Sequence, residues 1–368
     1  MQQEPNIDHT ALARLRQAMP QELDAVILHD PTHQFFLTSF PFEDGYVAVG
    51  RQDAWIFTDF RYVEAAQQEN ADGAFAVEQT TSPKKICAFL HAHGVKTLGY
   101  EDRYLTVFAL QDVWQPAARK EKLTLVPTGA LLTDLRRAKT PQQIAAIKEA
   151  QRITDLAFQH ILSELSPLPA SMTETDVALE LEFFMRKQGA QALSFPVIAV
   201  SGENSAKPHG VPLSRALQRG FLTMDFGCKV DGYCSDMTRT VCLGTPDAEM
   251  KRVYQTVLQA QQAALDALHE GMLCRDADQV ARDVIDGAGY RGMFGHALGH
   301  GVGLHIHEAP VFSPAAPQTL VLQEGDVVTV EPGIYLAGRF GVRIEDMITV
   351  QDHQVLDLTH SEKDLIVL

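Results

Sequence analysis

The second part of the chain carries a weak internal duplication, and this repeat restricts the fold more than any other feature of the sequence. In its first copy, a predicted helix at 155–165 is followed by another at 173–189, and strand-like runs come next. The second copy has predicted helices at 250–269 and 276–287, again followed by strand-like runs. The pattern predicts two αα-ββ halves that pack around a pseudo-twofold axis.

Acidic residues occupy matching positions in the two copies. The run TMDFG, which contains Asp225, aligns with TVEPG, which contains Glu331. Asp236 in SDM and Glu345 in EDM then stand in the strands that return after each turn. Within the first β-hairpin, a register that sets Asp225 opposite Asp236 would bring two carboxylates together. Pseudo-twofold packing would bring this pair face to face with the pair from the second half.

One interpretation of these four acids is that they lie in solvated turns. Each, however, follows or interrupts an apolar run, such as FLTM before Asp225 and VVTV before Glu331. Because an unpaired buried charge is costly, compensation by a pair of divalent cations explains them better. Mn²⁺, Co²⁺, Zn²⁺ and Fe²⁺ suit such oxygen-rich sites. The sequence has no HExxH motif and no CxxC pairs, which argues against a zincin and against a structural zinc site.

A nitrogen ligand is expected in the segment GHALGHGVGLHIHEAP, which lies between the two candidate carboxylate hairpins. Its four histidines are His296, His300, His305 and His307. Glycines at positions 295, 299, 301 and 303 argue against a regular helix. We therefore predict a tight segment in which the backbone closely approaches another part of the chain.

With 368 residues, the chain is long enough for two domains with separate cores. Alternating strands and helices predict a small α/β domain over residues 1–134, and residues 135–368 contain the duplication. The predicted strands of the first domain include 24–28, 35–40, 45–50 and 54–62. We expect Asp8 to cap a first helix and a later helix to start near Tyr62. After the boundary, Thr140 and Pro141 mark the start of a long amphipathic helix.

Composition excludes several kinds of partner. The net charge of −16 disfavours nucleic acid and anionic membranes, and it favours a cationic substrate such as a peptide with a free amino terminus. No signal peptide is predicted, and no apolar run approaches the ~20 residues that span a bilayer. The five cysteines are odd in number and predict free buried thiols in a reducing cytoplasm.

Five motifs follow one another along the chain: KPHG, TMDFGCKVDGYCSDMTRT, GHALGHGVGLHIHEAP, VEPGIY and VRIEDM. This set resembles the family of aminopeptidase P, prolidase, creatinase and, more distantly, methionine aminopeptidase, the pita-bread metallopeptidases. The region from FLTSF to TDFRY resembles their creatinase-like N-terminal domain, and HSEKDLIVL resembles their usual ending. The resemblance implies a mixed α/β (α+β) fold, with the creatinase-like domain at 1–134 and a pita-bread catalytic domain at 135–368.

The resemblance also implies a dinuclear metal centre. Its implied metal ligands are Asp225, Asp236, His300, Glu331 and Glu345. Asp236 and Glu345 would bridge the two ions. Glu331 would in addition act as the proton shuttle, taking a proton from water and helping to deliver it to the leaving nitrogen.

Further site residues follow from the same motifs. His209 and His307 match the two histidines that line the site and stabilise the substrate or the tetrahedral intermediate. His296, Tyr335 and Arg343 match positions that contact the substrate or support the ligands. Without the motifs, His209 would be interpreted as a solvated loop residue, Arg343 as a surface residue and Tyr335 as a core aromatic. His305 stands where many relatives have an acid, which we interpret as a benign substitution, with an effect on the pH dependence or on the subsite as the alternative.

The resemblance implies hydrolysis of the peptide bond between an N-terminal residue and a following proline. We expect an Xaa-Pro aminopeptidase with two divalent ions, Mn²⁺ first and Co²⁺ or Zn²⁺ as alternatives, acting on peptides with proline at the second position. A prolidase (Xaa-Pro dipeptidase), acting only on dipeptides, is the close alternative. A non-catalytic interaction protein is disfavoured because no ligand is missing, and creatinase and methionine aminopeptidase activities rank lower. A cytoplasmic homodimer is expected.

Overall fold

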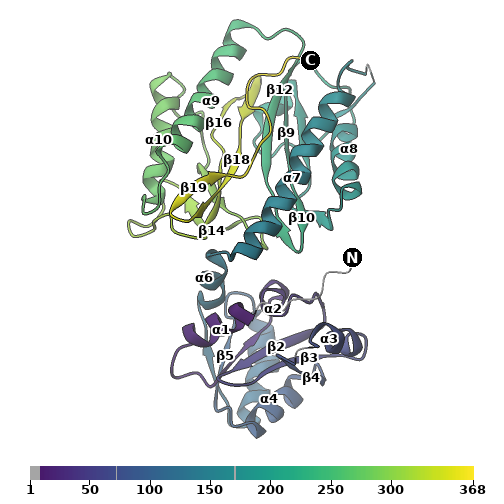
Figure 1. The fold of residues 1–368 in the computed structure, drawn as a ribbon, viewed down its shortest axis with the longest axis vertical. Helices are drawn as coiled ribbons and strands as arrows, with labels where there is room; N and C mark the ends of the chain where they lie inside the picture. Colours follow the sequence, from purple (N-terminus) through teal and green to yellow (C-terminus); the bar gives the residue numbers. More distant parts are fainter. Residues whose placement is uncertain (1–8, 72, 170) are drawn as a thin grey trace. The chain divides into compact units, whose positions relative to one another are not determined.

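The computed structural model describes residues 9–71, 73–169 and 171–368. The chain forms two compact units that divide between Arg136 and Arg137 (Figure 1). The predicted cap of the first helix, Asp8, lies outside the described residues, and helix α1 is described from His9 to Ala18. Among the described residues, no helix is both long and apolar enough to cross a membrane. All five cysteines are buried and free, which confirms the prediction of buried thiols.

The N-terminal unit is built on a six-stranded mixed sheet with the order β4-β3-β2-β1-β5-β6. Its strands are β1 (Ala25–Leu28), β2 (Gly45–Gly50), β3 (Ala54–Thr58), β4 (Ala76–Gln79), β5 (Thr97–Tyr100) and β6 (Thr124–Pro127). Its helices after α1 are α2 (Pro31–Thr38), α3 (Val63–Glu69), α4 (Pro83–Ala92), a π-helical turn (Ala109–Trp114), α5 (Gln115–Lys120) and α6 (Leu131–Arg137). Apolar side chains such as Ile27, Phe57 and Leu90 form its core.

One strand prediction in this unit is wrong. Residues 35–40 were expected to be extended, but residues up to Thr38 belong to helix α2. Asp30 caps this helix by accepting a hydrogen bond from the Thr32 amide at 2.8 Å, and Pro31 occupies its first turn. A short apolar run does not separate a strand from a buried helix, whereas the preceding Asp-Pro pair signals a helix start. The strand predicted to reach Tyr62 ends earlier, at Thr58.

The first half of the C-terminal unit begins with helices α7 (Pro141–Glu164) and α8 (Glu174–Lys187). They pack on a sheet of order β12-β9-β8 through side chains such as Phe158, Leu181 and Leu222. The strands are β8 (Ile198–Ser201), β9 (Gly220–Phe226) and β12 (Met237–Leu243), with a small sheet of β7 (Ala192–Leu193), β10 (Cys228–Val230) and β11 (Tyr233–Cys234). The helix predicted at 155–165 is the second part of the continuous helix α7.

The second half repeats this arrangement. Helices α9 (Ala248–Ala267) and α10 (Cys274–Gly287) pack on a sheet of order β14-β13-β15-β18-β19. Its strands are β13 (Gly299–Gly301), β14 (Glu308–Phe312), β15 (Val327–Val330), β18 (Asp346–Gln351) and β19 (Gln354–Asp357), with a hairpin of β16 (Gly333–Leu336) and β17 (Phe340–Arg343). In Figure 1 the strands of both halves lie between α7 and α8 on one side and α9 and α10 on the other.

The duplication is visible in the order of the strands. In the first half, β9 leads into the small hairpin β10-β11 and the chain returns along β12. In the second half, β15 leads into the hairpin β16-β17 and the chain returns along β18. The predicted acids stand at the junctions between the long strands and the small hairpins. Each half therefore delivers its acids to the same end of its sheet.

The start of helix α7 offers a test of the local sequence signals. The Thr140 hydroxyl accepts a hydrogen bond from the Gln143 amide, and the Gln143 side chain accepts one from the Thr140 amide at 3.1 Å. Loss of such a cap costs about 1 kcal/mol. Thr140→Ala should lower the free energy of unfolding by that amount in urea titrations of the full chain. The exposed turn residue Thr319 is the control. An equal loss in Thr319→Ala would contradict this role of the cap.

Candidate metal centre

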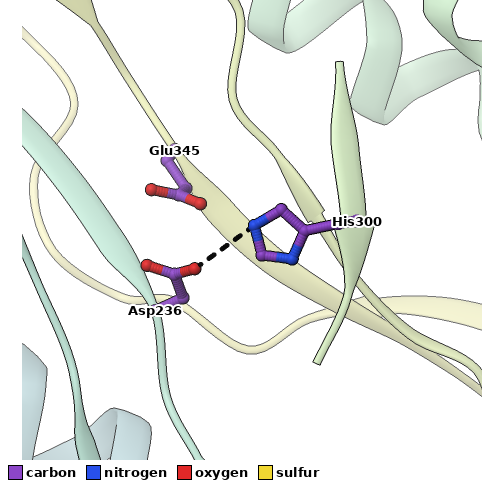
Figure 2. A group of neighbouring side chains, drawn as sticks. All are labelled: Asp236, His300 and Glu345. Atoms are coloured by element: carbon purple, nitrogen blue, oxygen red, sulfur yellow. Dashed lines mark ion pairs between the residues drawn. The ribbon is translucent and has the colours of Figure 1, made fainter. Parts of the chain in front are cut away.

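Three side chains from both halves converge at one point in the C-terminal unit. Asp236 precedes β12, Glu345 lies between β17 and β18, and His300 is the central residue of β13. One ligand atom from each lies within 4.8 Å of the others. Figure 2 shows the two carboxylates side by side, with the His300 ring directed at them. Asp236 and Glu345 are 4% and 1% exposed, so their charges are held almost entirely out of water.

Glycines on both sides of His300 permit this convergence. A Cβ atom at Gly299 would collide with the carbonyl of Thr329, and one at Gly301 would collide with the carbonyl of Ala309. Side chains at these positions would separate β13 from its neighbours on both sides. The predicted close backbone approach is therefore confirmed, and it explains why glycines alternate with other residues around His300.

The other two predicted acids flank this group. Glu331 follows β15, and its Oε1 lies 3.4 Å from Nε2 of His300. Asp225, in β9, accepts a hydrogen bond through Oδ2 from Nη2 of Arg343 at 2.6 Å. Arg343 also approaches Glu331, with 4.0 Å between Nε and Oε2. The four predicted acids therefore gather around His300, the fifth predicted ligand, and Arg343.

The observed register differs from one that sets Asp225 opposite Asp236. Asp225 pairs with Thr238, two residues beyond Asp236. Because side chains alternate along a strand, positions 236 and 238 face the same side, so Asp236 is a diagonal neighbour of Asp225. The carboxylates of the first half approach each other through this diagonal.

Burial raises the pKa values of all four carboxyl groups, and repulsion from neighbouring carboxylates adds to this for Asp236, Glu331 and Glu345. For Asp236, burial and the charges of Glu345 and Asp225 raise the pKa well above its usual range. Burial followed by the charge of Glu331 does the same for Glu345. Burial raises the pKa of Glu331 to about 8 and also raises that of Asp225, in both cases against the opposing charge of Arg343. Without cations, the cluster therefore retains protons at neutral pH.

His300 is arranged as a neutral ligand. Burial lowers its pKa to about 4, so the ring carries a free lone pair at neutral pH. Its Nδ1 lies 3.1 Å from the carbonyl of Gly301, which favours a proton on Nδ1 and leaves Nε2 to face Asp236 and Glu331. This is the arrangement that a metal-binding histidine requires.

The residues fit a pair of divalent ions. The Oδ1 atom of Asp225 is buried and has no hydrogen-bond partner among the described residues, so this oxygen is free to bind a cation. Four carboxylates and one imidazole suit Mn²⁺, Co²⁺, Fe²⁺ or Zn²⁺. Two divalent cations would also neutralise four carboxylates and remove the repulsion that now raises their pKa values.

Arg343, Tyr335 and His296 form a hydrogen-bonded chain beside the acids. Arg343 Nη1 donates to the Tyr335 hydroxyl at 2.9 Å, and this hydroxyl lies 2.9 Å from Nε2 of His296. Burial lowers the pKa of His296 to about 4, so its neutral Nε2 accepts the hydroxyl proton while Nδ1 faces the carbonyl of Ala297. These hydrogen bonds fix the orientation of the Arg343 guanidinium against Asp225.

The remaining predicted histidines are exposed. The His307 ring packs edge-on against His300, with 4.2 Å between centroids. His209 follows Pro208, whose carbonyl accepts a hydrogen bond from Arg343 at 3.3 Å. Burial, and then the charge of His209, lowers the pKa of His307, so the two histidines influence each other electrostatically. His305 is also exposed and lies with His307 in a bent segment between β13 and β14 rather than on a strand.

Two threonines of the centre were missed from the sequence. The Thr238 hydroxyl donates to Oε2 of Glu345 at 2.6 Å and accepts from Arg343 Nε at 3.0 Å. The Thr329 hydroxyl donates to Oε1 of Glu331 at 3.1 Å and accepts from the His300 amide at 3.0 Å. Each stands two residues from a predicted acid, Thr238 after Asp236 and Thr329 before Glu331. The period of two along a strand was the signal that could have identified them.

Comparison with known proteins gives consistent matches over both units. Residues 145–352 match metallopeptidase family M24, and residues 12–138 match the creatinase/prolidase N-terminal domain. The chain is 38% identical over 360 residues to the peptidase YqhT of Bacillus subtilis, covering 97% of this chain and 99% of that one.

Solved structures give the same match. An Xaa-Pro dipeptidase from Bacillus anthracis superposes with a TM-score of 0.90 at 38% identity, covering 98% of this chain and 99% of that chain. An X-Pro aminopeptidase from Thermotoga maritima superposes with a TM-score of 0.88 at 31% identity, covering 97% and 99%.

Metal affinity should increase with pH. Below its pKa of about 8, Glu331 holds a proton that a cation must displace, whereas above this pH the carboxylate is free. We expect Mn²⁺ affinity to rise between about pH 6 and about pH 8, with protons released on binding. Calorimetric titration in two buffers of different ionisation enthalpy would count those protons. An affinity independent of pH, without proton release, would contradict this description of the cluster.

Proposed function

The chain belongs to metallopeptidase family M24 and has a creatinase/prolidase N-terminal domain, and from this premise we propose that it hydrolyses the peptide bond between an N-terminal residue and a following proline. The resemblance drawn from the motifs is confirmed, as are the predicted fold class and the assignment as a metallopeptidase. One observation carries the proposal: Asp236, His300 and Glu345, from both halves, direct ligand atoms at one point.

We assign the five predicted ligands to two ions, with Asp236 and Glu345 shared between them. The burial of these two carboxylates supports this assignment, because a buried charge needs a counter-charge. Bound there, divalent ions would polarise the substrate carbonyl and lower the pKa of water. The predicted preference for Mn²⁺ over Co²⁺ or Zn²⁺ belongs to this proposal, as do the domain boundary at 134/135 and the homodimer.

The chain's own residues supply the proton transfers. Glu331 takes a proton from the attacking water and passes it to the leaving proline nitrogen, because its carboxylate is held beside His300 at the edge of the acid cluster. His307 and His209 donate to the carbonyl oxygen as negative charge develops on it. Arg343, fixed by Tyr335, donates a hydrogen bond to Asp225 and orients the bound peptide.

Two exopeptidase activities, which differ in the length of peptide they accept, agree with this chemistry. We place Xaa-Pro aminopeptidase first, because the exposed His209 and His307 border the buried acids on a solvent-facing side, where a longer peptide could continue. Xaa-Pro dipeptidase is the second candidate, because a solved structure that bears this name is 38% identical and covers almost the whole chain. The X-Pro aminopeptidase with a TM-score of 0.88 supports the first candidate.

A peptide panel distinguishes these candidates. Metal-loaded enzyme should release the first residue from Xaa-Pro-Yaa peptides, and chelation should abolish the release. Cleavage of Xaa-Pro dipeptides alone would assign the prolidase range instead. Activity confined to Met-Ala-Yaa peptides would refute the proline specificity, and a metal-loaded protein without any peptidase activity would favour an interaction protein.

Substitution of a shared ligand tests the metal assignment. Asp236→Asn removes a charge that we assign to both ions, so it should prevent binding of two ions and lower kcat/KM by more than about 100-fold, the upper range for changes in outer-shell partners. Metal content by mass spectrometry and peptide hydrolysis would measure both effects. Asp266→Asn, at an exposed site on α9, is the control. Full activity with two bound ions in Asp236→Asn would disprove the ligand assignment.

A further inference from the structure

The two halves of the C-terminal unit meet directly behind the candidate metal centre. The Glu345 amide donates to the carbonyl of Thr238 at 3.1 Å, which joins the start of β18 to β12. Asp236 lies two residues before Thr238, just ahead of β12, and Glu345 lies immediately before β18. The separation of these two carboxylates therefore depends on this junction between the halves.

Arg239 binds both strands of this junction from the face opposite the acids. Thr238 directs its hydroxyl to Glu345, so the next side chain along the strand leaves the other face. Nη1 of Arg239 donates to the carbonyl of Thr238 at 3.0 Å and to that of Glu345 at 2.6 Å. One guanidinium nitrogen thus binds one backbone carbonyl from each half.

The other donors of Arg239 bind the C-terminal segment and one acid of β18. Nη2 donates to Oδ1 of Asp346 at 2.7 Å and to the carbonyl of Ser361 at 2.8 Å, and Nε donates to the carbonyl of Glu362 at 3.0 Å. An arginine has five N–H groups, and all five find acceptors here. The side chain is 1% exposed, so none of these bonds competes with bulk water.

The segment around Ser361 is itself held in place. Asp155, on α7, accepts hydrogen bonds from the Ser361 amide at 3.0 Å and from its hydroxyl at 2.6 Å. Lys363 Nζ donates to Oδ2 of Asp346 at 2.5 Å. Helix α7, the C-terminal segment and both strands are therefore linked through Arg239 to the backbone of Glu345.

We infer that Arg239 is a positioning residue of the metal centre, which fixes the backbone of Glu345 relative to Asp236 and makes the segment around Ser361 part of the support of the site. This inference rests on the proposed function, because it assumes that Glu345 and Asp236 bind metal. A lysine keeps the charge but has a single ammonium group, so it does not bind five acceptors in this planar geometry.

The test compares Arg239 with Arg137, an arginine that pairs with another buried acid. Arg239→Lys should weaken Mn²⁺ binding by about 10- to 100-fold, as changes in outer-shell partners do, and should alter the visible absorption spectrum of the Co²⁺-loaded protein. Arg137→Lys is the control, because Arg137 forms a comparable ion pair with the buried Asp326 and donates to the carbonyl of Val321. Its affinity and spectrum should match those of the wild type. Calorimetry and circular dichroism would record affinity and folding for both variants.

Equal Mn²⁺ affinity and equal Co²⁺ spectra in folded Arg239→Lys and Arg137→Lys would overturn the inference. If Arg239→Lys does not fold, Asp155→Asn decides, since it loosens the segment around Ser361 from outside the centre. Weaker Mn²⁺ binding in Asp155→Asn would support the inference, and wild-type binding would overturn it. Glu345→Gln tests the proposed ligand set separately. If this variant binds two ions like the wild type, the ligand set itself is wrong.

Discussion

Repulsion among four buried carboxylates is the constraint on which the C-terminal unit depends. Burial raises the pKa values of Asp225, Asp236, Glu331 and Glu345, and the charges of neighbouring carboxylates raise those of Asp236, Glu331 and Glu345 further. Arg343 offsets part of the charge through its ion pair with Asp225. A fold tolerates such a cluster when packing elsewhere holds it together and cations neutralise it in the working state. The two halves share the same order of helices and strands, and this arrangement supplies that packing.

The duplication explains how one chain builds the cluster. In each half, a pair of helices covers a sheet whose long strands place acids at the base of a small hairpin. Neither half holds enough ligands alone, since the histidine ligand His300 belongs to the second half and Asp236 belongs to the first. The centre therefore exists only where the halves meet, and the bonds of Arg239 to Thr238 and Glu345 lie at that junction.

Much of this was predictable from local patterns. The helix pairs follow from apolar periodicity, and the caps at Thr140 and Thr173 locate two helix starts within a residue. Predictions failed where local signals were ambiguous: the apolar run at 35–40 forms part of α2, because the capping signal of Asp30 and Pro31 outweighs its strand-like composition. Thr238 and Thr329 were missed because a threonine near an acid carries no distinctive signal until the facing strand is known.

The sequence by itself determined the kinds of residue in the centre and their order along the chain, because the repeat, the glycines around His300 and the motifs are all local. It also determined that the acids follow apolar strands and are therefore buried. Only the tertiary structure decided which of them meet. The register that pairs Asp225 with Thr238 rather than Asp236 depends on the length of the segment between β9 and β12. Four of the five bonds of Arg239 reach residues more than 100 positions away along the chain. Such registers arise from packing of the whole unit, which no short stretch of sequence specifies.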